Sequence, residues 1–301
     1  MEKNVKVKKK EIKVSHIIIL VALIAYTVSL LAPMLWMLLT SFKDVAKWDA
    51  ALNGSNFIGV VWIDSFNAEN YSAAYKSFKV TRTINGLNYM SDMFTMFGNS
   101  IVYAAGCGLV ATLTPCIAAY LCARYDYAFG KWVYTLVLIT IAVPIVGNLP
   151  SEMRMVDALG LMDNVFGLLI LKTSFLGINF LIFYAQFQGI PKDYTSAAEI
   201  DGAGEFRIMV QIIFPLAIST ILTIFLLNFI NFWNDYQIPM IYWHSRPVIA
   251  YGLFEFSNNS DAAKTPVRLA GALMTAVPIL VVFAVFNKQL MANISAGGIK
   301  G

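Results

Sequence analysis

Long apolar stretches that are almost free of charge dominate this chain, and they constrain its fold more than any other feature. Six of them have the length of about 20 residues that a helix needs to cross the hydrocarbon core of a bilayer. Helices of this kind satisfy their own backbone hydrogen bonds, as a chain in hydrocarbon must. We therefore predict an all-α, polytopic membrane protein with six transmembrane helices, over residues 16–41, 98–121, 132–150, 165–187, 213–235 and 269–288.

The composition excludes several other classes of protein. Hydrophobic residues make up 58% of the chain and charged residues 13%, whereas a soluble domain has about 25% charged residues. Disorder requires low hydrophobicity and high net charge, but the formal net charge here is only +4. The three cysteines, Cys107, Cys116 and Cys122, are too few for a disulfide scaffold, and we expect them to be packing residues.

The distribution of basic residues predicts how the chain is oriented. Six lysines crowd the first thirteen residues, ahead of an apolar run that is too long for a signal peptide. The segments assigned to the inside carry eleven lysines and arginines in about 63 residues, and those assigned to the outside carry nine in about 103. The positive-inside rule therefore places both termini in the cytoplasm.

This orientation divides the chain into five parts. They are a basic cytoplasmic tail (1–15), the first span (16–41), an extracytoplasmic loop or small lobe (42–97), a helical core (98–288) and a cytoplasmic C-terminal tail (289–301). The 42–97 segment is polar and aromatic, and its Asn-Gly pairs at Asn53 and Asn85 predict turns.

Motifs for catalysis are missing from the sequence. It has no GxxxxGK[ST] phosphate-binding loop, so we do not expect the chain to hydrolyse ATP. Its two histidines, His16 and His244, lie in different regions, and no Cys/His cluster has metal-ligand spacing. We therefore predict no enzymatic active site, no metal site, no cofactor bound by this chain and no nucleic-acid partner.

The loop between the fourth and fifth expected spans is the most informative segment. Asp193 or Thr195 can cap a short helix there, and Gly202 would end it. Ala197 and Ala198 would give this helix a shallow surface that a partner protein can approach closely. The alternative is an ordinary helix lying at the membrane interface.

The same loop resembles the EAA motif in the permease subunits of ATP-binding-cassette (ABC) importers. That motif reads E-A-A, three residues, G, nine residues, I-x-L-P. In this chain Ala197-Ala198 is followed by Gly202 and then by Ile212-Ile213-Phe214-Pro215, all at the spacing of the motif. The resemblance implies that the loop at about 193–204 forms a coupling helix that docks on a separate ATPase.

The sequence departs from the motif at two positions. Phe214 replaces Leu, and Ser196 replaces the Glu that the family is expected to pair with a basic residue on the ATPase. Ser196 cannot form that ion pair, so Glu199 or Asp201 could supply the charge instead. The residues that the resemblance assigns to ATPase coupling are Ser196, Ala197, Ala198, Glu199, Asp201, Gly202 and Pro215.

Other segments extend the resemblance over most of the chain, in the order and spacing of the carbohydrate-uptake, maltose-type branch of the family. They are Glu69-Asn70-Tyr71, Asn99-Ser100, the stretch 118–125, the stretch 158–161, Trp233-Asn234-Asp235-Tyr236 and the ending 295–301. The 42–97 segment fits the family pattern least well and looks longer than usual.

The resemblance implies a transport complex in the cell membrane of a prokaryote. This chain would form half of the translocation pathway and pair with a second permease subunit in the lipid bilayer. Two ATPase subunits would hold ATP and Mg²⁺, and a solute-binding protein outside the membrane would deliver a carbohydrate. ATP binding would draw the two coupling helices together and rock the spans from an inward-facing to an outward-facing state.

Polar residues within the fifth expected span are candidates for the solute pathway. Asn228, Asn231 and Asp235 share one helix face, and polar side chains at membrane depth usually face a bundle interior or a watery path. Trp233 offers a flat apolar face that can stack against a sugar ring, and Asn234 is its neighbour. The alternative is that these polar groups form hydrogen bonds between helices.

Two further groups have a functional and a structural interpretation. Gly297, Gly298 and Lys300 in the C-terminal tail either reach the ATPase interface or belong to a frayed end. Lys172, a few residues inside the fourth expected span, is expected to extend to the outer membrane interface instead of contacting solute.

Three other functions are alternatives to an importer permease: a secondary transporter, a membrane enzyme and a non-catalytic membrane scaffold. A secondary transporter is expected to show repeated halves and its own ion site. We find no repeat, and no convincing buried carboxylate in the spans apart from Asp235. An enzyme would need an acid–base or metal set, which the sequence does not display.

Overall fold

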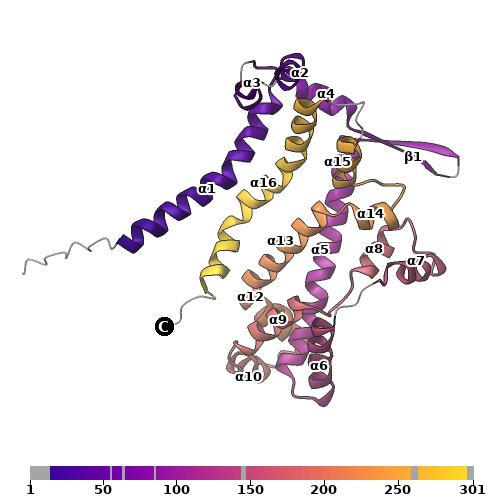
Figure 1. Cartoon of the computed structure of the whole chain (residues 1–301). Coiled ribbons are helices and arrows are strands. Elements are labelled where there is room, and N and C mark those ends of the chain that lie inside the picture. Colours follow the sequence, from indigo (N-terminus) through magenta and orange to yellow (C-terminus); the bar gives the residue numbers. More distant parts are fainter. Residues whose placement is uncertain are drawn as a thin grey trace, which may run out of the picture. The chain divides into compact units, whose positions relative to one another are not determined.

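The computed structural model describes residues 14–54, 56–62, 65–84, 86–143, 147–258 and 264–296, and the described chain is mostly helical (Figure 1). Two compact units are present: residues 1–75 with 260–273 form the first, and residues 76–259 with 274–301 form the second. The long helix α16, Thr265–Ala296, contributes its first turns to one unit and the remainder to the other.

The first unit begins with a long apolar helix. Helix α1, Val14–Ser41, is 28 residues long, and its side chains are exposed from residue 14 to residue 35. A uniformly apolar, uncovered helix suits contact with lipid. Short helices α2, Val45–Asn53, and α3, Phe57–Val61, follow, and α4, Glu69–Ser77, leads out of the unit.

Side-chain hydrogen bonds join these helices within the first unit. The buried amide of Asn70 donates to the backbone carbonyls of Ser41 at 2.8 Å and Lys43 at 2.7 Å, so it satisfies carbonyls at the end of α1. The Tyr71 hydroxyl bonds to that of Ser41 at 2.8 Å. These bonds give the Glu69-Asn70-Tyr71 segment a structural role.

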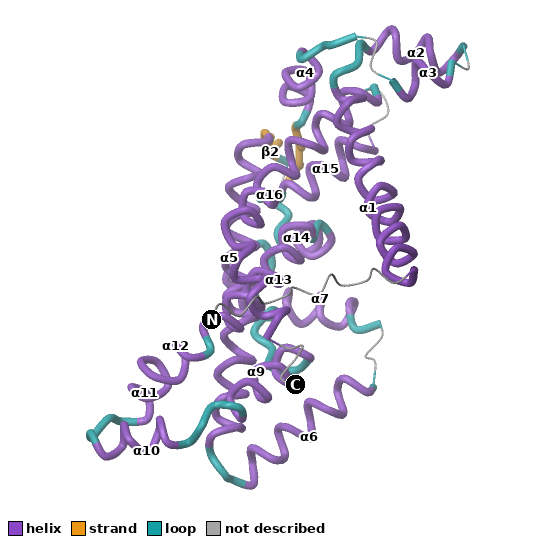
Figure 2. The backbone as a smooth tube through the Cα atoms, turned by 90° about the vertical axis from the view of Figure 1, so that its left-hand side faces the viewer, coloured by secondary structure: helices purple, strands orange, loops and turns teal. Residues whose placement is uncertain are grey.

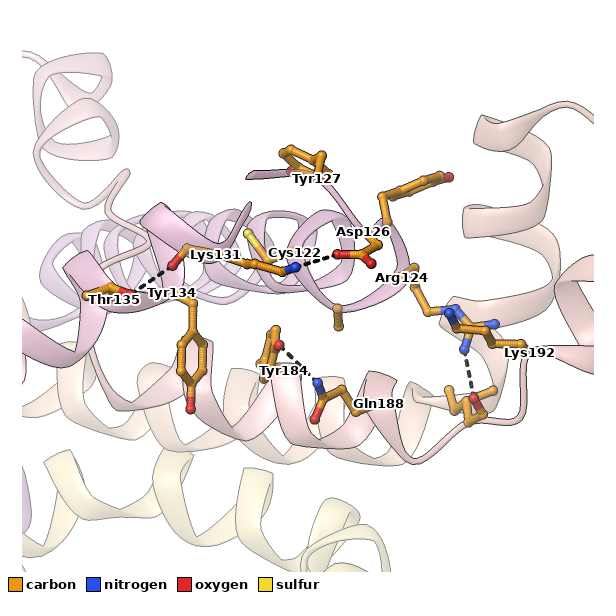
Figure 3. A pocket seen from close by; sticks show the side chains of 13 residues that line it. Cys122, Arg124, Asp126, Tyr127, Lys131, Tyr134, Thr135, Tyr184, Gln188 and Lys192 are labelled. Carbon is orange, nitrogen blue, oxygen red and sulfur yellow. Dashed lines mark hydrogen bonds and ion pairs between the residues drawn. The ribbon is translucent and has the colours of Figure 1, made fainter. Parts of the chain in front are cut away.

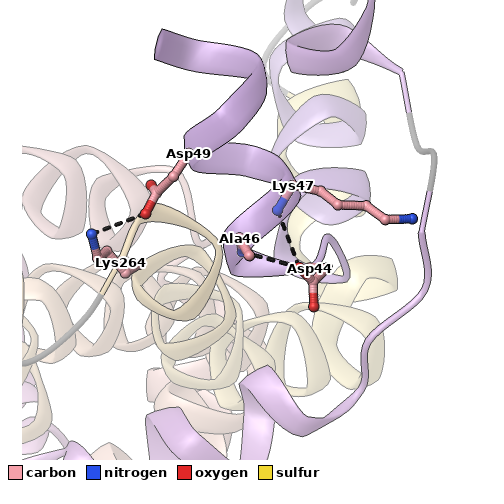
Figure 4. A network of polar contacts seen from close by, with 5 residues as sticks. All are labelled: Asp44, Ala46, Lys47, Asp49 and Lys264. Carbon is pink, nitrogen blue, oxygen red and sulfur yellow. Dashed lines mark hydrogen bonds and ion pairs between the residues drawn. The ribbon is translucent and has the colours of Figure 1, made fainter. Parts of the chain in front are cut away.

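Charged side chains fix helix α2 in the same unit (Figure 4). The Asp44 carboxylate caps the helix by accepting from the backbone N–H groups of Ala46 and Lys47 at 3.0 and 3.1 Å. One turn further on, Asp49 pairs with the Lys264 ammonium at 2.9 Å. The pair is largely exposed, so it positions the helix and adds little stability.

The second unit opens with a β-hairpin, which corrects the prediction of an all-α fold. Strands β1, Lys79–Ile84, and β2, Leu87–Asp92, pair antiparallel. Gly86, in the connection between them, has φ 77°, a conformation that glycine adopts without strain. Gly86 therefore has the conformation expected of the glycine in an Asn-Gly turn, and Asn85 lies outside the described residues.

Helices make up the rest of the second unit. They are α5 (Met93–Arg124), α6 (Ala128–Ala142), α7 (Leu149–Ala158), α8 (Val165–Leu171), α9 (Ile178–Gln188), α10 (Asp193–Ile200), α11 (Glu205–Ile208), the π-helix η1 (Met209–Ile213), α12 (Phe214–Leu216), α13 (Ile218–Asn234), α14 (Gln237–Tyr242) and α15 (Ile249–Asn258). Figure 2 shows α10 and α11 at the end of this unit opposite the hairpin.

Helix α5 is the central element of the second unit and packs most extensively against α13 and α9. Small residues permit this contact: a Cβ at Gly108 would lie 3.4 Å from the backbone nitrogen of Phe229 on α13. The small residue at this position thus allows α13 to pack closely on α5. Near the start of α5, the Ser100 hydroxyl accepts from the backbone N–H of Ile249 at 2.7 Å and so holds the segment before α15.

The prediction of six continuous spans is not confirmed. Three described helices are long and apolar enough to cross a bilayer, namely Val14–Ser41, Met93–Arg124 and Thr265–Phe286. A fourth span is available if the two segments Glu205–Leu216 and Ile218–Asn234, which meet at an angle of 78°, are counted as one. Both the first and last of these helices tolerate an internal proline, at Pro33 and Pro278.

The third and fourth expected spans differ from the prediction for local reasons. The third is represented by α6, whose 15 residues fall short of a bilayer thickness. The fourth is divided into α8 and α9 by residues 172–177. Gly177 has φ 134°, which a helix cannot contain, so α9 begins anew after it.

Gly167 in α8 provides a stability prediction. A Cβ at this position would lie 2.1 Å from the Leu161 carbonyl oxygen, and this backbone atom cannot move aside easily. We expect Gly167→Ala to destabilise the protein by at least about 1–3 kcal/mol, the usual cost of overpacking. Gly98→Ala is the matched control, because a Cβ on Gly98 meets nothing within 4 Å. Thermal unfolding in detergent checks both; equal stability of the two variants would contradict the prediction.

Candidate functional site

The short helix in the 193–204 loop is present and ends where the sequence predicts. Helix α10 closes with Gly202 at φ 78°, and the Ala203 N–H donates to the Ala198 carbonyl at 2.9 Å. A left-handed glycine with such a bond is a common way to end a helix. The predicted side-chain cap is wrong: the N-cap residue is Lys192, and it makes no side-chain capping bond.

Arg124, the last residue of α5, holds the start of this loop. Its guanidinium Nη1 donates to the Ile190 carbonyl at 2.7 Å, and Nη2 donates to the Thr195 hydroxyl in the first turn of α10. The fork of donors on an arginine can bind two acceptors at once, and bonds from a charged donor are strong. The hydroxyl of Thr195 therefore serves as an anchor for α5 and not as a helix cap.

Tyr125, the next residue, holds the far side of the loop. Its hydroxyl donates to the Glu205 carboxylate at the start of α11. Burial, and secondarily this bond, raise the pKa of Tyr125 above its ordinary value, so the phenol remains a proton donor at neutral pH. The adjacent residues Arg124 and Tyr125 thus fasten both ends of the loop to one helix.

Besides the anchor at Thr195, helix α10 has one buried side chain in the core. Ala198 is 6% exposed and packs in a buried cluster that includes Tyr120, Phe187, Ile208 and Ile213. The cluster joins α10 to α5, α9 and the π-helix η1. Ala198 therefore places α10 in direct packing contact with these helices.

The remaining residues assigned to ATPase coupling lie on the surface or at a bend. Ser196, Ala197, Glu199, Asp201 and Gly202 are exposed. Pro215 lies in α12, immediately before the 78° bend at Ala217. Proline lacks an N–H and disrupts the hydrogen-bond ladder, which accounts for the bend.

Sequence reasoning missed three apolar residues around this loop. Tyr194 and Ile200 on α10 and Phe206 on α11 are 50%, 86% and 74% exposed, and grouped exposed apolar side chains are a candidate contact surface for a partner protein. Their signal in the sequence is the presence of large apolar residues on either side of Gly202. With Ala197 they form what we call the docking face of α10 and α11.

The structure places the candidate pathway residues in different environments. The Asn228 amide donates to the Thr112 hydroxyl on α5 at 3.0 Å, and Asp235 accepts from the Tyr103 hydroxyl at 2.8 Å. Asp235 also accepts from the backbone N–H of Gln237, the first residue of α14, at 3.0 Å. These two residues therefore link α13 to neighbouring elements, as the alternative interpretation supposes.

The other three candidates do not join that arrangement. Asn231 is exposed, Trp233 is buried, and the exposed Asn234 bonds to the Ile230 carbonyl of its own helix at 2.8 Å. Lys172 lies with its ammonium 5.9 Å from the centre of the Phe232 ring. Gly297, Gly298 and Lys300 lie outside the described residues.

No group of three or more His, Cys, Asp or Glu side chains in the described part of the chain is arranged to hold a metal ion. The two cysteines most deeply placed in α5, Cys107 and Cys116, are buried free thiols. Cys122 is partly buried and also free.

Comparison with known proteins gives these features a context. Residues 111–290 match the family model described as binding-protein-dependent transport system inner membrane component. The diacetylchitobiose uptake system permease protein NgcG of Streptomyces coelicolor is 24% identical and is aligned over 91% of this chain and 86% of its own. The maltodextrin transport system permease protein MdxG of Bacillus subtilis is 27% identical over 79% of this chain and 87% of its own.

A solved structure shares the fold. A chain in the crystal structure of a bacterial ABC transporter involved in the import of the acidic polysaccharide alginate superposes with a TM-score of 0.70. The alignment covers 93% of this chain and 99% of that chain, at 21% sequence identity. The two chains therefore share one helical fold.

Proposed function

This chain belongs to the family of binding-protein-dependent transport system inner membrane components, and from this premise we propose that it is the membrane-spanning permease subunit of an ATP-driven carbohydrate importer. The family match carries the proposal, because residues 111–290 include α10, the docking face and the helices that they rest on. Both termini and the 193–204 loop would lie on the cytoplasmic side of a prokaryotic cell membrane.

Carbohydrate is the solute class that the relatives favour. Those named above take up diacetylchitobiose and maltodextrin, and a permease of Halalkalibacterium halodurans that is 28% identical over 69% of this chain serves arabinooligosaccharides. All three names describe oligosaccharides, which present many hydroxyl groups and flat apolar ring faces. We accordingly propose an oligosaccharide or a derivative of one as the solute.

The partners follow from what the chain lacks. Without a phosphate-binding loop it needs a separate ATPase that holds ATP and Mg²⁺. A second permease chain would complete the pathway, and a solute-binding protein outside the membrane would supply the carbohydrate. Closure of the ATPase dimer on ATP would push α10, and differential binding of ATP and loaded binding protein to the outward-facing state would drive the cycle.

The contacts at the end of α5 indicate how the push would travel. Arg124 and Tyr125 fasten the loop on both sides of α10, and Ala198 fixes α10 itself in the core. A movement of the docking face would therefore carry the end of α5 with it. Near the other end of α5, Asn99 and Ser100 form hydrogen bonds with the backbone just before and at the start of α15. The single helix α5 therefore connects the loop that carries α10 with α15.

Asn231 is the strongest remaining pathway candidate, because its side chain is exposed. The amide of Asn228, one turn earlier, is already hydrogen-bonded to the Thr112 hydroxyl. We expect Asn231→Leu to lower carbohydrate uptake about five-fold, the equivalent of one hydrogen bond of about 1 kcal/mol, with basal ATPase activity unchanged. Asn228→Leu is the contrasting variant and should lower thermal stability instead. Wild-type uptake by the Asn231 variant would leave this residue without a role in solute passage.

The proposed solute class is tested by uptake in cells that lack the gene for this chain. We expect the deletion to abolish uptake of at least one labelled oligosaccharide and the restored gene to recover it, while uptake of labelled amino acids and peptides is unaffected. A deletion strain that loses amino-acid or peptide uptake, and keeps uptake of every oligosaccharide, would contradict the proposal.

A further inference from the structure

A cavity of about 660 Å³ lies beside the loop that carries α10 (Figure 3). It is formed by the end of α5, the start of α6 and the end of α9, and the proposed transport cycle assigns no ligand to it. Its volume falls in the usual range of sites for small molecules or headgroups. We therefore asked what chemistry its lining would recognise.

The lining carries more positive than negative charge. Three cationic side chains, Arg124, Lys131 and Lys192, face it, with Asp126 as the one carboxylate among its lining residues. Lys131 pairs with Asp126 at 2.9 Å, and this hydrogen-bonded pairing holds the pKa of Asp126 below its usual range. Both side chains are about 80% exposed, at 78% and 81%, so the pair opens at little cost.

The other two cations form no ion pair with a carboxylate in the described part of the chain, although Lys192 lies close enough to Asp126 to help lower its pKa. Arg124 donates to a carbonyl and a hydroxyl, which satisfy its donors but leave its charge. Lys192 makes no ion pair with any residue that the structure describes. Tyr134 and Tyr184, whose ring centres are 4.6 Å apart, add hydroxyl groups to the wall. Such a lining favours an anion with several oxygen acceptors, such as a phosphate ester.

Aromatic side chains beside the cavity identify where that anion would come from. Tyr127, Phe129 and Trp132 stack in sequence at the start of α6, with ring centres 6.4 and 5.8 Å apart. Phe129 and Trp132 are 64% and 59% exposed. Uncovered aromatic rings next to basic residues at the end of an apolar helix are typical of the headgroup region of a bilayer.

We propose that this cavity binds the phosphate headgroup of an anionic phospholipid, with Lys131 and Lys192 as the principal ligands and the row of Tyr127, Phe129 and Trp132 against the acyl chains. Basic pockets between helices at the cytoplasmic side of a membrane are suited to such headgroups. The assignment to the cytoplasmic leaflet rests on the orientation given in the proposed function. The binding of a phosphate headgroup rests on the residues that line the cavity.

Lipid at this position would support the loop that carries α10. Lys192 immediately precedes α10. Arg124 lines the cavity and also donates a hydrogen bond to the Thr195 hydroxyl in α10. A headgroup bridging Lys131 and Lys192 would therefore tie α6 to the entrance of the loop. The attachment of α10 to the core would be strengthened when the site is filled.

The test is native mass spectrometry of the purified permease complex in detergent, titrated with phosphatidylglycerol or phosphatidylcholine. The variant is K131Q/K192Q, whose two exposed side chains can change without disturbing the core. The matched control is K79Q/R207Q, which removes the same charge at two exposed positions outside the cavity. Elution of each complex as a single intact species establishes that it is folded.

We expect phosphatidylglycerol to bind about 25-fold more weakly to K131Q/K192Q, since each lysine near a lipid headgroup contributes about five-fold. The control should bind as the wild type does, and phosphatidylcholine should bind weakly to all three. Equal losses in the variant and the control, or no loss in either, would overturn the proposal. So would displacement of phosphatidylglycerol by equimolar inorganic phosphate. Because no transport is measured, this result is independent of whether the chain imports a carbohydrate.

Discussion

Replacement of Arg124 by glutamine is expected to reduce ATP-driven uptake at least ten-fold while the ATPase continues to hydrolyse ATP. The variant loses the charged donors that hold the Ile190 carbonyl and the Thr195 hydroxyl. A hydrogen bond to a charged group contributes about 1.5–3 kcal/mol, so the loop would detach readily from α5. A push on α10 would then move the loop without moving the helix.

Two further variants separate this role from a general effect of charge. Arg124→Lys should restore little of the ATP-driven uptake, because one ammonium group cannot reach both the Ile190 carbonyl and the Thr195 hydroxyl as the guanidinium does. Arg207→Gln removes an exposed charge whose side chain donates to nearby Gln211 in η1 at 2.9 Å, and should keep normal coupling. The ratio of solute imported to ATP hydrolysed is the measurement. An unchanged ratio in Arg124→Gln would rule out a coupling role for this residue.

Ala198→Phe is expected to have an effect of similar size by a different route. Ala198 is enclosed by the buried cluster of α5, α9 and η1, so a phenyl ring can be accommodated only if α10 moves away from the core. Overpacking of this kind costs about 1–3 kcal/mol. We expect the complex to assemble, ATP hydrolysis to persist and uptake to fall about ten-fold or more.

Ala198→Ser is the control for that experiment, because it adds one small atom at the same site. It should retain most of the uptake of the wild type. Co-purification of the ATPase with each variant establishes assembly, and uptake is compared at equal amounts of complex. Wild-type uptake by Ala198→Phe would show that the position of α10 against the core does not matter for coupling.

The sequence predicted the short helix of the 193–204 loop because local signals determine it. Gly202 can adopt the left-handed conformation that ends α10. This signal depends on one residue type at one place in the sequence. The predicted cap at Asp193 or Thr195 failed because Thr195 is used by Arg124, which lies 71 residues away in the chain.

Long-range contacts explain most of what the sequence did not predict. Apolar length alone indicated a continuous fourth span, but residues 172–177 interrupt it and Gly177 starts a new helix. The 78° bend before α13 is signalled only by Pro215, and a proline inside a membrane helix often leaves the helix continuous. The hydrogen bonds of Arg124 and Tyr125 join residues that are far apart in the chain, so no periodic pattern in the sequence predicts them.

The central claim is that a separate ATPase, acting on the loop that carries α10, drives solute through this chain. It is tested most directly by uptake of labelled oligosaccharide into proteoliposomes that contain both permease chains and the ATPase, with the loaded binding protein on the opposite side from ATP. We predict uptake with the active ATPase and none when the ATPase is omitted or cannot hydrolyse ATP. Uptake that continues at the same rate without the ATPase would contradict the account.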